Sequence, residues 1–242
     1  MSSTTTIDSR LSYSEYTQEE FQRLLDEHGY VYMNEIPADF DHESFMRGFG
    51  EFMPQYDGQK VWSVKSQKRF ENMYHSLNTR ALYPHTECYE FPEASPQYLG
   101  LWGVVRASDG GGQTTLLDGR KFIATLTDDE RQQLSSRRYE YVSADGVLEM
   151  KLGRTAVHPM YEIREGREPI FRFSYNNVNH NDDPFLLDIR DRVVEFFEKN
   201  HVAVDIEPGA ILIWNNHRVL HSRTAYTDER RHLRRVWLAE AA

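Results

Sequence analysis

The chain of 242 residues carries 28 Lys and Arg against 38 Asp and Glu, which gives a net charge of −10. This length favours a single domain spanning the whole sequence, and the acidic balance argues against nucleic acid or an anionic membrane as a partner. Its one cysteine, Cys88, allows no internal disulfide and no cysteine-based zinc site, so any metal would need His and carboxylate ligands. The sequence contains no membrane-length apolar run and Met1–Arg10 does not read as a secretory signal, so we expect a cytoplasmic protein.

The first elements that the sequence predicts are two helices on either side of a strand. The segment Thr17–His28 opens with a capping residue followed by two glutamates, and Gly29 is typical of a helix end. The alternating segment Tyr30–Ile36 is predicted as a strand. Asp41 is a good N-cap for a second helix, which the apolar spacing predicts to run through Phe52. We expect the two helices to cover a sheet.

Further along the chain, short apolar or alternating runs separated by turn residues predict strands. These runs are Tyr98–Ala107, Tyr139–Val142, Ala156–Ile163, Ile170–Tyr175, Ile211–Trp214 and His232–Leu238. Helices are predicted near Asp128–Arg137 and from Asp183 to Asn200, the second with an apolar stripe that we expect in the core. Many strands with few helices between them are typical of an antiparallel, jelly-roll-like barrel. The predicted fold is therefore mainly β with flanking helices, in which N-terminal helices at about residues 14–53 pack on a core at about residues 82–240.

A candidate metal site begins at His85-Thr86-Glu87. In extended backbone, residues two apart point to the same face, so one metal ion could bind both side chains. A third ligand could come from the segment after Ile211–Trp214, which contains His217 and His221. Two histidines and one carboxylate suit non-heme iron(II) and oxygen chemistry. On spacing alone, a surface pair of His85 and Glu87 remains an alternative.

Three segments in this order resemble the superfamily of iron(II)/2-oxoglutarate-dependent oxygenases that includes taurine dioxygenase and γ-butyrobetaine hydroxylase. They are His85-Thr86-Glu87; Tyr98–Arg106 followed by Gly111-Gly112-Gln113-Thr114-Thr115; and Trp214-Asn215-Asn216-His217-Arg218-Val219-Leu220-His221 followed by Arg231-His232-Leu233. The resemblance extends over about Leu82–Leu238 and implies a double-stranded β-helix (jelly-roll) core. It also implies Fe(II) as cofactor, with 2-oxoglutarate and O2 as cosubstrates.

The resemblance also implies roles for individual residues. It makes His85, Glu87 and His221 the iron ligands, with Glu87 in a position where most relatives have aspartate. It matches Arg231 to the arginine that binds the distal carboxylate of 2-oxoglutarate, a task suited to the guanidinium fork, and Thr114 to the hydroxyl that assists it. His217 is expected to be packed or hydrogen-bonded rather than a ligand.

The substrate is less well defined by the sequence. Arg235 lies on the same strand face as Arg231 and is the candidate for a substrate carboxylate, with a solvated basic cluster as the alternative. Tyr175 and Asn177 belong to a polar strand end that either lines the substrate pocket or forms a hydrogen-bonded turn. We expect hydroxylation or desaturation of an unactivated C–H bond in a small molecule.

The preferred substrate class is an amino acid or an amino-acid-derived metabolite, free or on a carrier, and a small sulfonate or betaine-type acid is the alternative. Two other classes of protein also remain possible. One is a non-catalytic cupin-like binding protein, and the other is a zinc hydrolase, although the sequence lacks the H-E-x-x-H helix of the latter. The sequence makes no prediction of oligomeric state.

Overall fold

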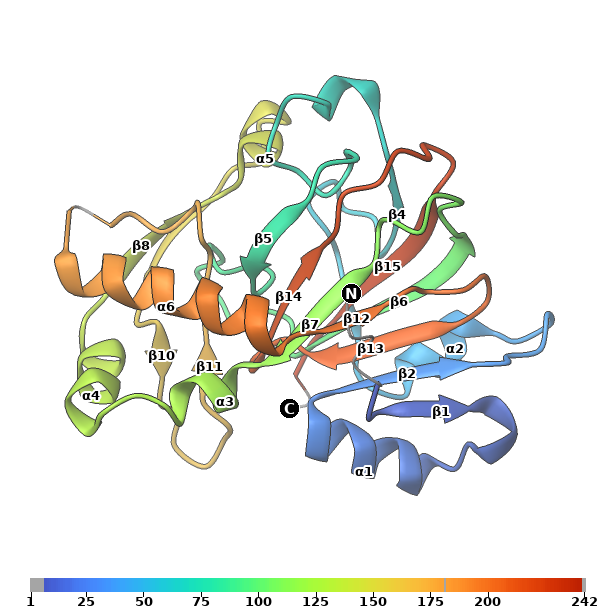
Figure 1. Cartoon of the computed structure of the whole chain (residues 1–242), viewed down its shortest axis with the longest axis horizontal. Helices are drawn as coiled ribbons and strands as arrows, with labels where there is room; N and C mark the ends of the chain where they lie inside the picture. The colour runs from blue at the N-terminus through green and yellow to red at the C-terminus, as the bar shows by residue number, and fades with distance from the viewer. Residues whose placement is uncertain (1–6, 181, 241–242) are drawn as a thin grey trace.

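Two large sheets form the centre of the computed structural model, which describes residues 7–180 and 182–240 (Figure 1). Ser2–Thr6, at the start of the chain, lie outside the described residues. The larger sheet has the order β1-β2-β13-β6-β15-β3, with β4 also paired to β15. Its strands are β1 Arg10–Ser12, β2 Tyr30–Asn34, β3 Phe52–Met53, β4 Val61–Lys65, β6 Tyr98–Val105, β13 Ile211–Asn215 and β15 His232–Leu238. All of these pairs are antiparallel except β1–β2.

The smaller sheet has the order β12-β7-β14-β5, and all of its pairs are antiparallel. Its strands are β5 Leu82–His85, β7 Thr114–Asp118, β12 Val202–Val204 and β14 Val219–Arg223. Two further strand pairs are β8 Tyr139–Val142 with β9 Thr155–His158, and β10 Tyr161–Glu162 with β11 Ile170–Phe171. The helices are α1 Gln18–His28, α2 His42–Arg47, α3 Gly119–Ile123, α4 Asp128–Ser136, α5 Asp145–Glu149 and α6 Pro184–Asn200, with short 3-10 helices at Tyr13–Glu15 and Lys68–Phe70. The fold is thus a mixed α/β arrangement of several sheets.

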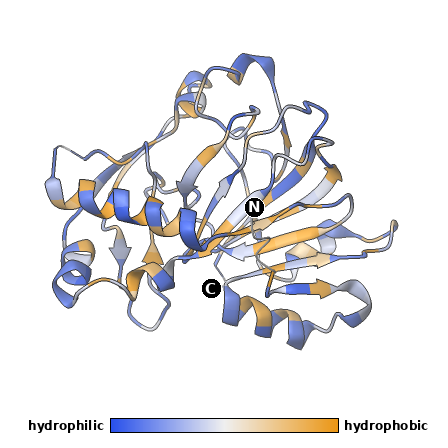
Figure 2. Cartoon of the chain, viewed as in Figure 1, coloured by the Kyte–Doolittle hydropathy of each residue, from blue (hydrophilic) through white to orange (hydrophobic). Residues whose placement is uncertain are grey.

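Hydrophobic residues gather on strands of the larger sheet (Figure 2), and the alternation of side chains along a strand separates the core into layers. On β2, Tyr30 and Tyr32 belong to a buried cluster that also contains Leu116 and Val219 of the smaller sheet. The intervening residue Val31 belongs to a second cluster, on the opposite face of the larger sheet. The first cluster therefore joins the inner faces of the two sheets.

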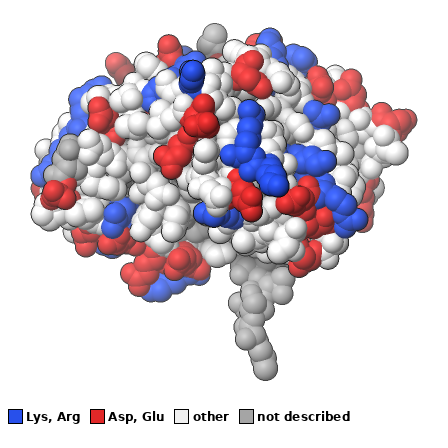
Figure 3. Space-filling model, turned by 90° about the horizontal axis from the view of Figure 1, so that it is seen from above, with Lys and Arg blue, Asp and Glu red and all other residues white. Residues whose placement is uncertain are grey.

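Helices cover the outer faces of both sheets. The second cluster contains Phe21 and Leu24 of α1 and Met46 of α2, which confirms that the N-terminal helices cover a sheet. The apolar stripe of α6 is likewise buried, in a third cluster with Leu117 and Leu220 of the smaller sheet. Over the face seen in Figure 3, acidic side chains lie beside basic ones.

Several predicted elements agree with the structure. Thr17 caps α1 through its side chain, which accepts a hydrogen bond from the backbone N–H of Glu20 at 3.1 Å, and Gly29 ends the helix with φ of 82°. The predicted bounds of β8 and β15 are also correct. None of the helices in residues 7–180 and 182–240 has the length and apolarity needed to span a lipid bilayer.

Other boundaries were predicted wrongly. The second helix ends at Arg47 instead of continuing through Phe52, which lies in β3 and pairs with Leu238. Gly50, at φ of 152°, lies between them in a backbone conformation that L side chains rarely adopt. The strand predicted from Ile170 to Tyr175 ends at Phe171. The N-terminal part of the chain also contributes strands β1 to β4 to the larger sheet, so it is more than a helical layer.

Candidate active site

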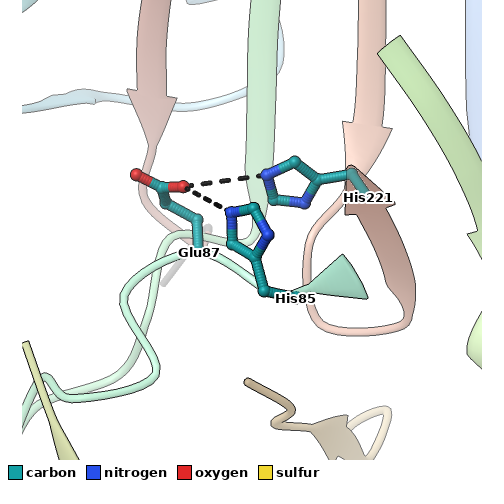
Figure 4. A group of neighbouring side chains, drawn as sticks. All are labelled: His85, Glu87 and His221. Carbon is teal, nitrogen blue, oxygen red and sulfur yellow. Dashed lines mark ion pairs between the residues drawn. The ribbon is translucent and has the colours of Figure 1, made fainter. Parts of the chain in front are cut away.

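Strand pairing brings together two histidines that are far apart in the sequence. β5 and β14 are antiparallel neighbours, and His85 lies directly opposite His221. Their ring centroids are 4.2 Å apart. Glu87 reaches the same place from the loop that follows β5, so all three predicted metal ligands converge (Figure 4).

The loop that carries Glu87 is held on both sides by buried hydrogen bonds. Asn216, in the turn between β13 and β14, accepts from the backbone N–H of Glu87 at 2.7 Å and donates to its carbonyl at 3.1 Å. Thr86 donates its backbone N–H to Phe173 at 2.9 Å. Glu87 therefore lies just beyond the end of the strand, whereas the sequence pattern placed it beside His85 in extended backbone.

The spacing of the three side chains suits a bound cation. Glu87 Oε2 lies 3.8 Å from His85 Nε2 and 3.7 Å from His221 Nε2, and the three ligand atoms all lie within 4.8 Å of one another. These distances exceed hydrogen-bond length. Ligand atoms bonded to one ion at about 2.1 Å are separated by about 3.0–3.6 Å. The two distances from Glu87 Oε2 to the histidine nitrogens are only slightly longer.

Hydrogen bonding also prepares His85 for this role. Its Nδ1 lies 2.8 Å from the carbonyl oxygen of Tyr83, and because a carbonyl can only accept, Nδ1 carries the proton. The lone pair of the neutral ring is therefore on Nε2, which faces Glu87 and His221. This arrangement is typical of histidines that bind metals.

The charge states of the other two ligands fit a metal as well. Burial opposes ionisation of Glu87, but the Arg235 guanidinium and the two histidines outweigh it and hold the pKa of this carboxyl well below its usual range. Burial, with a smaller contribution from His85, lowers the pKa of His221 to about 4. A carboxylate and a neutral imidazole, the forms that bind metals, are thus present at neutral pH.

A cavity of about 60 Å³ is lined by these three residues and by three buried arginines, Arg223, Arg231 and Arg235. Thr114 also lines it. Arg231 donates from Nη2 to the carbonyl of Gly112 at 2.6 Å, but its Nη1 is buried without a partner among the described residues, as is Nε of Arg223. Buried cations without an ion-pair partner are costly, so the part of the cavity next to Arg231 and Arg223 is suited to an anion.

A second cavity, of about 50 Å³, is also lined by His85 and Glu87. It shares Ser76, Leu82, His85, Glu87 and Arg235 with the first cavity and is otherwise lined by Tyr56, Tyr74, His75, Cys88, Tyr89, Ala144 and Val147. Arg235 binds Glu87 Oε1 through Nη1 at 2.9 Å and Gln55 Oε1 through Nε at 2.9 Å. Its Nη2 is buried and has no partner within residues 7–180 and 182–240.

The structure does not bring every predicted site residue to these cavities. Among the described residues, Tyr175 and Asn177 line neither cavity. Tyr175 is stacked on Tyr83 at 4.4 Å, and the backbone N–H of Asn177 donates to Ser174 Oγ at 3.2 Å, as in the hydrogen-bonded turn that the sequence left open. His217 is buried with Nε2 at 3.0 Å from the carbonyl of Ser95, which confirms the expectation of a packed, hydrogen-bonded residue.

Three residues near the site were not predicted from the sequence. Asn216 and Arg223 lie in the segment that carries His221, and Gln55 precedes β4. The position of Asn216 directly after an apolar strand is a turn signal that could have identified it. Gln55 has no such signal, because its role depends on pairing between distant parts of the chain.

Comparison with known proteins identifies the family. The family model described as Taurine catabolism dioxygenase TauD, TfdA family matches residues 4–237. Among curated proteins, no sequence matches significantly.

Solved structures share the fold at low sequence identity. A structure of asparagine oxygenase with Fe(II), 2S,3S-3-hydroxyasparagine and succinate has a TM-score of 0.75 at 17% identity, over 91% of this chain and 77% of that one. A structure of the non-heme iron oxygenase OrfP with Fe and alpha-ketoglutaric acid has a TM-score of 0.69 at 20% identity, over 91% and 78%. OrfP with Fe, succinate and (3S)-hydroxy-L-Arg gives 0.72 at 19% identity, over 94% and 83%.

The match over nearly the whole chain and the His-Glu-His group agree with each other. The chain belongs to the TauD/TfdA family of Fe(II)- and 2-oxoglutarate-dependent oxygenases.

Proposed function

We propose that this protein is a dioxygenase that hydroxylates, or desaturates, an unactivated C–H bond of an amino acid or amino-acid-derived metabolite. One observation carries the proposal. A single cavity is lined both by His85, Glu87 and His221 and by a buried arginine with an unused donor, Arg231. This pairing of a cation site with an anion site matches the two ends of a metal-chelating dicarboxylate.

In this proposal His85 and His221, through Nε2, and Glu87, through Oε2, hold Fe(II). The donor set fits, because two neutral imidazoles and one carboxylate leave other coordination positions open. When bound, iron with 2-oxoglutarate and O2 supplies the oxidising chemistry, with succinate and CO2 as coproducts. The chain's own residues set the position of the reactants, and position decides which C–H bond is oxidised.

Arg231 and Thr114 would bind the distal carboxylate of 2-oxoglutarate. Arg231 already uses Nη2 on Gly112, and the ring of Tyr226 lies 5.1 Å from its guanidinium carbon. These contacts hold the fork in place while Nη1 remains available. A second guanidinium, that of Arg223, lies in the same cavity and adds positive charge at the end where the carboxylate would bind.

The second cavity is the proposed substrate site. Its polar contributors include Arg235, whose free Nη2 suits a substrate carboxylate. The solved structures of asparagine oxygenase and OrfP that share this fold hold hydroxylated amino acids, which supports an amino-acid-like substrate. Tyr175 and Asn177 line neither cavity, so they are proposed as neighbours of the substrate site and not as direct contacts of the substrate.

We further propose that the two facing sheets form a double-stranded β-helix and that the whole chain is one oxygenase domain. The support is that N-terminal strand β2 pairs directly with β13, so the early segment shares a sheet with the strands that lead to the site. Both sheets also contribute to a single buried cluster.

To test the function, the protein is incubated in air with Fe(II), 2-oxoglutarate and a panel of compounds. The panel contains amino acids, their carrier-bound forms, sulfonates and betaines. Succinate release and product mass are measured together. We expect substrate-dependent succinate and a product heavier by one oxygen atom, or lighter by two hydrogen atoms, for an amino-acid compound. Coupled turnover of only a sulfonate or betaine would contradict the substrate class, and no succinate with any compound would contradict the activity.

A further inference from the structure

The two oxygens of Glu87 have different partners. Oε2 faces His85 at 3.8 Å and His221 at 3.7 Å, too far for hydrogen bonds but suited to a shared cation. Oε1 lies 2.9 Å from Nη1 of Arg235, at the length of a charge-assisted hydrogen bond. The carboxylate is therefore divided between a metal position and a guanidinium.

Arg235 is itself held from several sides. Gln55 accepts from its Nε at 2.9 Å and donates to its backbone carbonyl at 2.9 Å, so one amide contacts both the side chain and the main chain of the arginine. The guanidinium carbon also lies 4.7 Å from the ring centre of Trp62 and 5.0 Å from that of Trp237. Such contacts with two indoles restrict the plane of the guanidinium.

Glu87 has more need of this support than a shorter ligand would. A glutamate has one more rotatable bond than an aspartate, so more side-chain entropy is lost when it is fixed. A free carboxylate can also bind a metal through either or both oxygens. A guanidinium held on Oε1 leaves only Oε2 to face the two histidines.

We propose that Gln55 and Arg235 are positioning residues that fix Glu87 so that Oε2 alone binds the metal ion. This inference rests on the proposed function, in which Glu87 is a metal ligand. It is separate from any contact between Arg235 and substrate, because it uses Nε and Nη1 and leaves Nη2 free.

The experiment is an anaerobic titration of the metal-free protein with Fe(II), without 2-oxoglutarate or substrate. The variants are Arg235→Lys, which keeps the charge but lacks the planar fork that binds Gln55 and Glu87 through separate nitrogens, and Gln55→Leu, which leaves both charges in place. We expect each to weaken Fe(II) affinity about tenfold or more, as loss of such supporting contacts does in other metal sites. The matched control is Arg234→Lys on the same strand, with unchanged affinity.

Fe(II) affinity equal to the wild type in both folded variants would overturn the inference. A crystal structure of the wild type with Fe(II) tests it without any substitution, because Oε1 must remain within hydrogen-bond distance of Arg235 Nη1. Coordination through both oxygens would also overturn it. Failure of the proposed function looks different: His221→Ala would then bind Fe(II) as well as the wild type does.

Discussion

Each of the two histidines in the site is expected to be necessary for metal binding. His85→Ala or His221→Ala removes one of three ligands, and within the described residues those three form the one group able to hold an ion. We expect loss of Fe(II) binding and of turnover with an intact fold, checked by Fe(II) titration and circular dichroism. Wild-type affinity in either variant would mean that the ligands are assigned wrongly. His201→Ala serves as the matched control, because His201 lines neither cavity and its Nδ1 lies 2.9 Å from the carbonyl oxygen of Phe197.

Substitutions of Glu87 test whether the site requires a carboxylate ligand and whether its length matters. Glu87→Ala removes the only acidic ligand of the group, so hydroxylation should collapse even where some Fe(II) still binds. Glu87→Asp should keep metal binding but move the carboxylate by about one methylene and separate it from Arg235, so that 2-oxoglutarate decay becomes poorly coupled to product. The ratio of succinate to product measures this coupling. Full coupling in Glu87→Asp would contradict the positioning argument.

Arg231 and Arg235 are expected to have separable roles. Arg231→Ala removes a charge-assisted bond of about 1.5–3 kcal/mol in a buried cavity, which corresponds to a loss of roughly tenfold to a hundredfold or more in 2-oxoglutarate affinity. Arg231→Lys should restore it only in part, because a point charge cannot reproduce the fork. Arg235→Ala should weaken Fe(II) binding and raise the apparent constant for an acidic substrate, but with saturating Fe(II) it should leave 2-oxoglutarate affinity nearly unchanged. Both are followed by anaerobic 2-oxoglutarate titration, and equal loss of 2-oxoglutarate affinity in the two Ala variants would show that the cosubstrate site is misplaced.

At the scale of elements, the turn between β13 and β14 is expected to stabilise the loop that carries Glu87. Asn216→Ala leaves the N–H and carbonyl of Glu87 and the carbonyl of Pro96 without the partner that the structure gives them. Buried groups left in this way cost about 1–3 kcal/mol each. We expect a lower free energy of unfolding and weaker Fe(II) binding, measured by urea denaturation and metal titration. Asn176→Ala, at an exposed position, is the control. Equal unfolding free energies and equal Fe(II) affinities of the two variants would show that the hydrogen bonds of Asn216 do not support the loop.

The elements also show where sequence reasoning was effective. Local signals were sufficient where the sequence of one segment decides its own structure, as in the capped helix α1 that Gly29 ends and in the strand β15, whose bounds were predicted correctly. They failed where distant pairing decides, as at Phe52, which joins β15 instead of extending a helix. Strands β7 and β14 were missed as elements because polar residues such as Thr114, Ser222 and Arg223 interrupt their apolar pattern, although both strands are buried along their whole length.

In the site, too, local patterns predicted some residues, while contacts between distant segments could not be predicted. His85 and Glu87 are close in sequence and show a pattern, whereas the pairing of Arg235 with Glu87 depends on how the loop after β5 meets β15. No spacing rule relates Gln55 to Arg235, 180 positions away. Residue types and order therefore predicted the candidate ligands, but the contacts that support them required the folded chain.

At the scale of the whole molecule, buried histidines are expected to make stability depend on pH. Burial lowers the pKa of His217 to about 4, while the unfolded chain would titrate at about 6.5. Below pH 6.5 the unfolded state binds a proton that the folded state does not, so this residue's contribution is complete above about pH 6.5 and is lost as the pH falls toward 4. The slope is about 1.4 kcal/mol per pH unit.

His217→Gln keeps an amide donor for Ser95 but does not titrate. Urea denaturation between pH 5 and 6 should therefore show a shallower pH dependence than the wild type, by about 1.4 kcal/mol per pH unit. Parallel curves for the two proteins would contradict the buried, neutral state of His217.

The central claim, that this chain binds Fe(II) and 2-oxoglutarate together in one cavity, is tested most directly by adding both to the metal-free protein without oxygen. The chelate of iron by the keto acid gives a visible charge-transfer band. We expect the band in the wild type at one equivalent of Fe(II), its absence in His221→Ala, and a higher 2-oxoglutarate requirement in Arg231→Ala. No band in the folded wild-type protein, or an equal band in His221→Ala, would contradict the account.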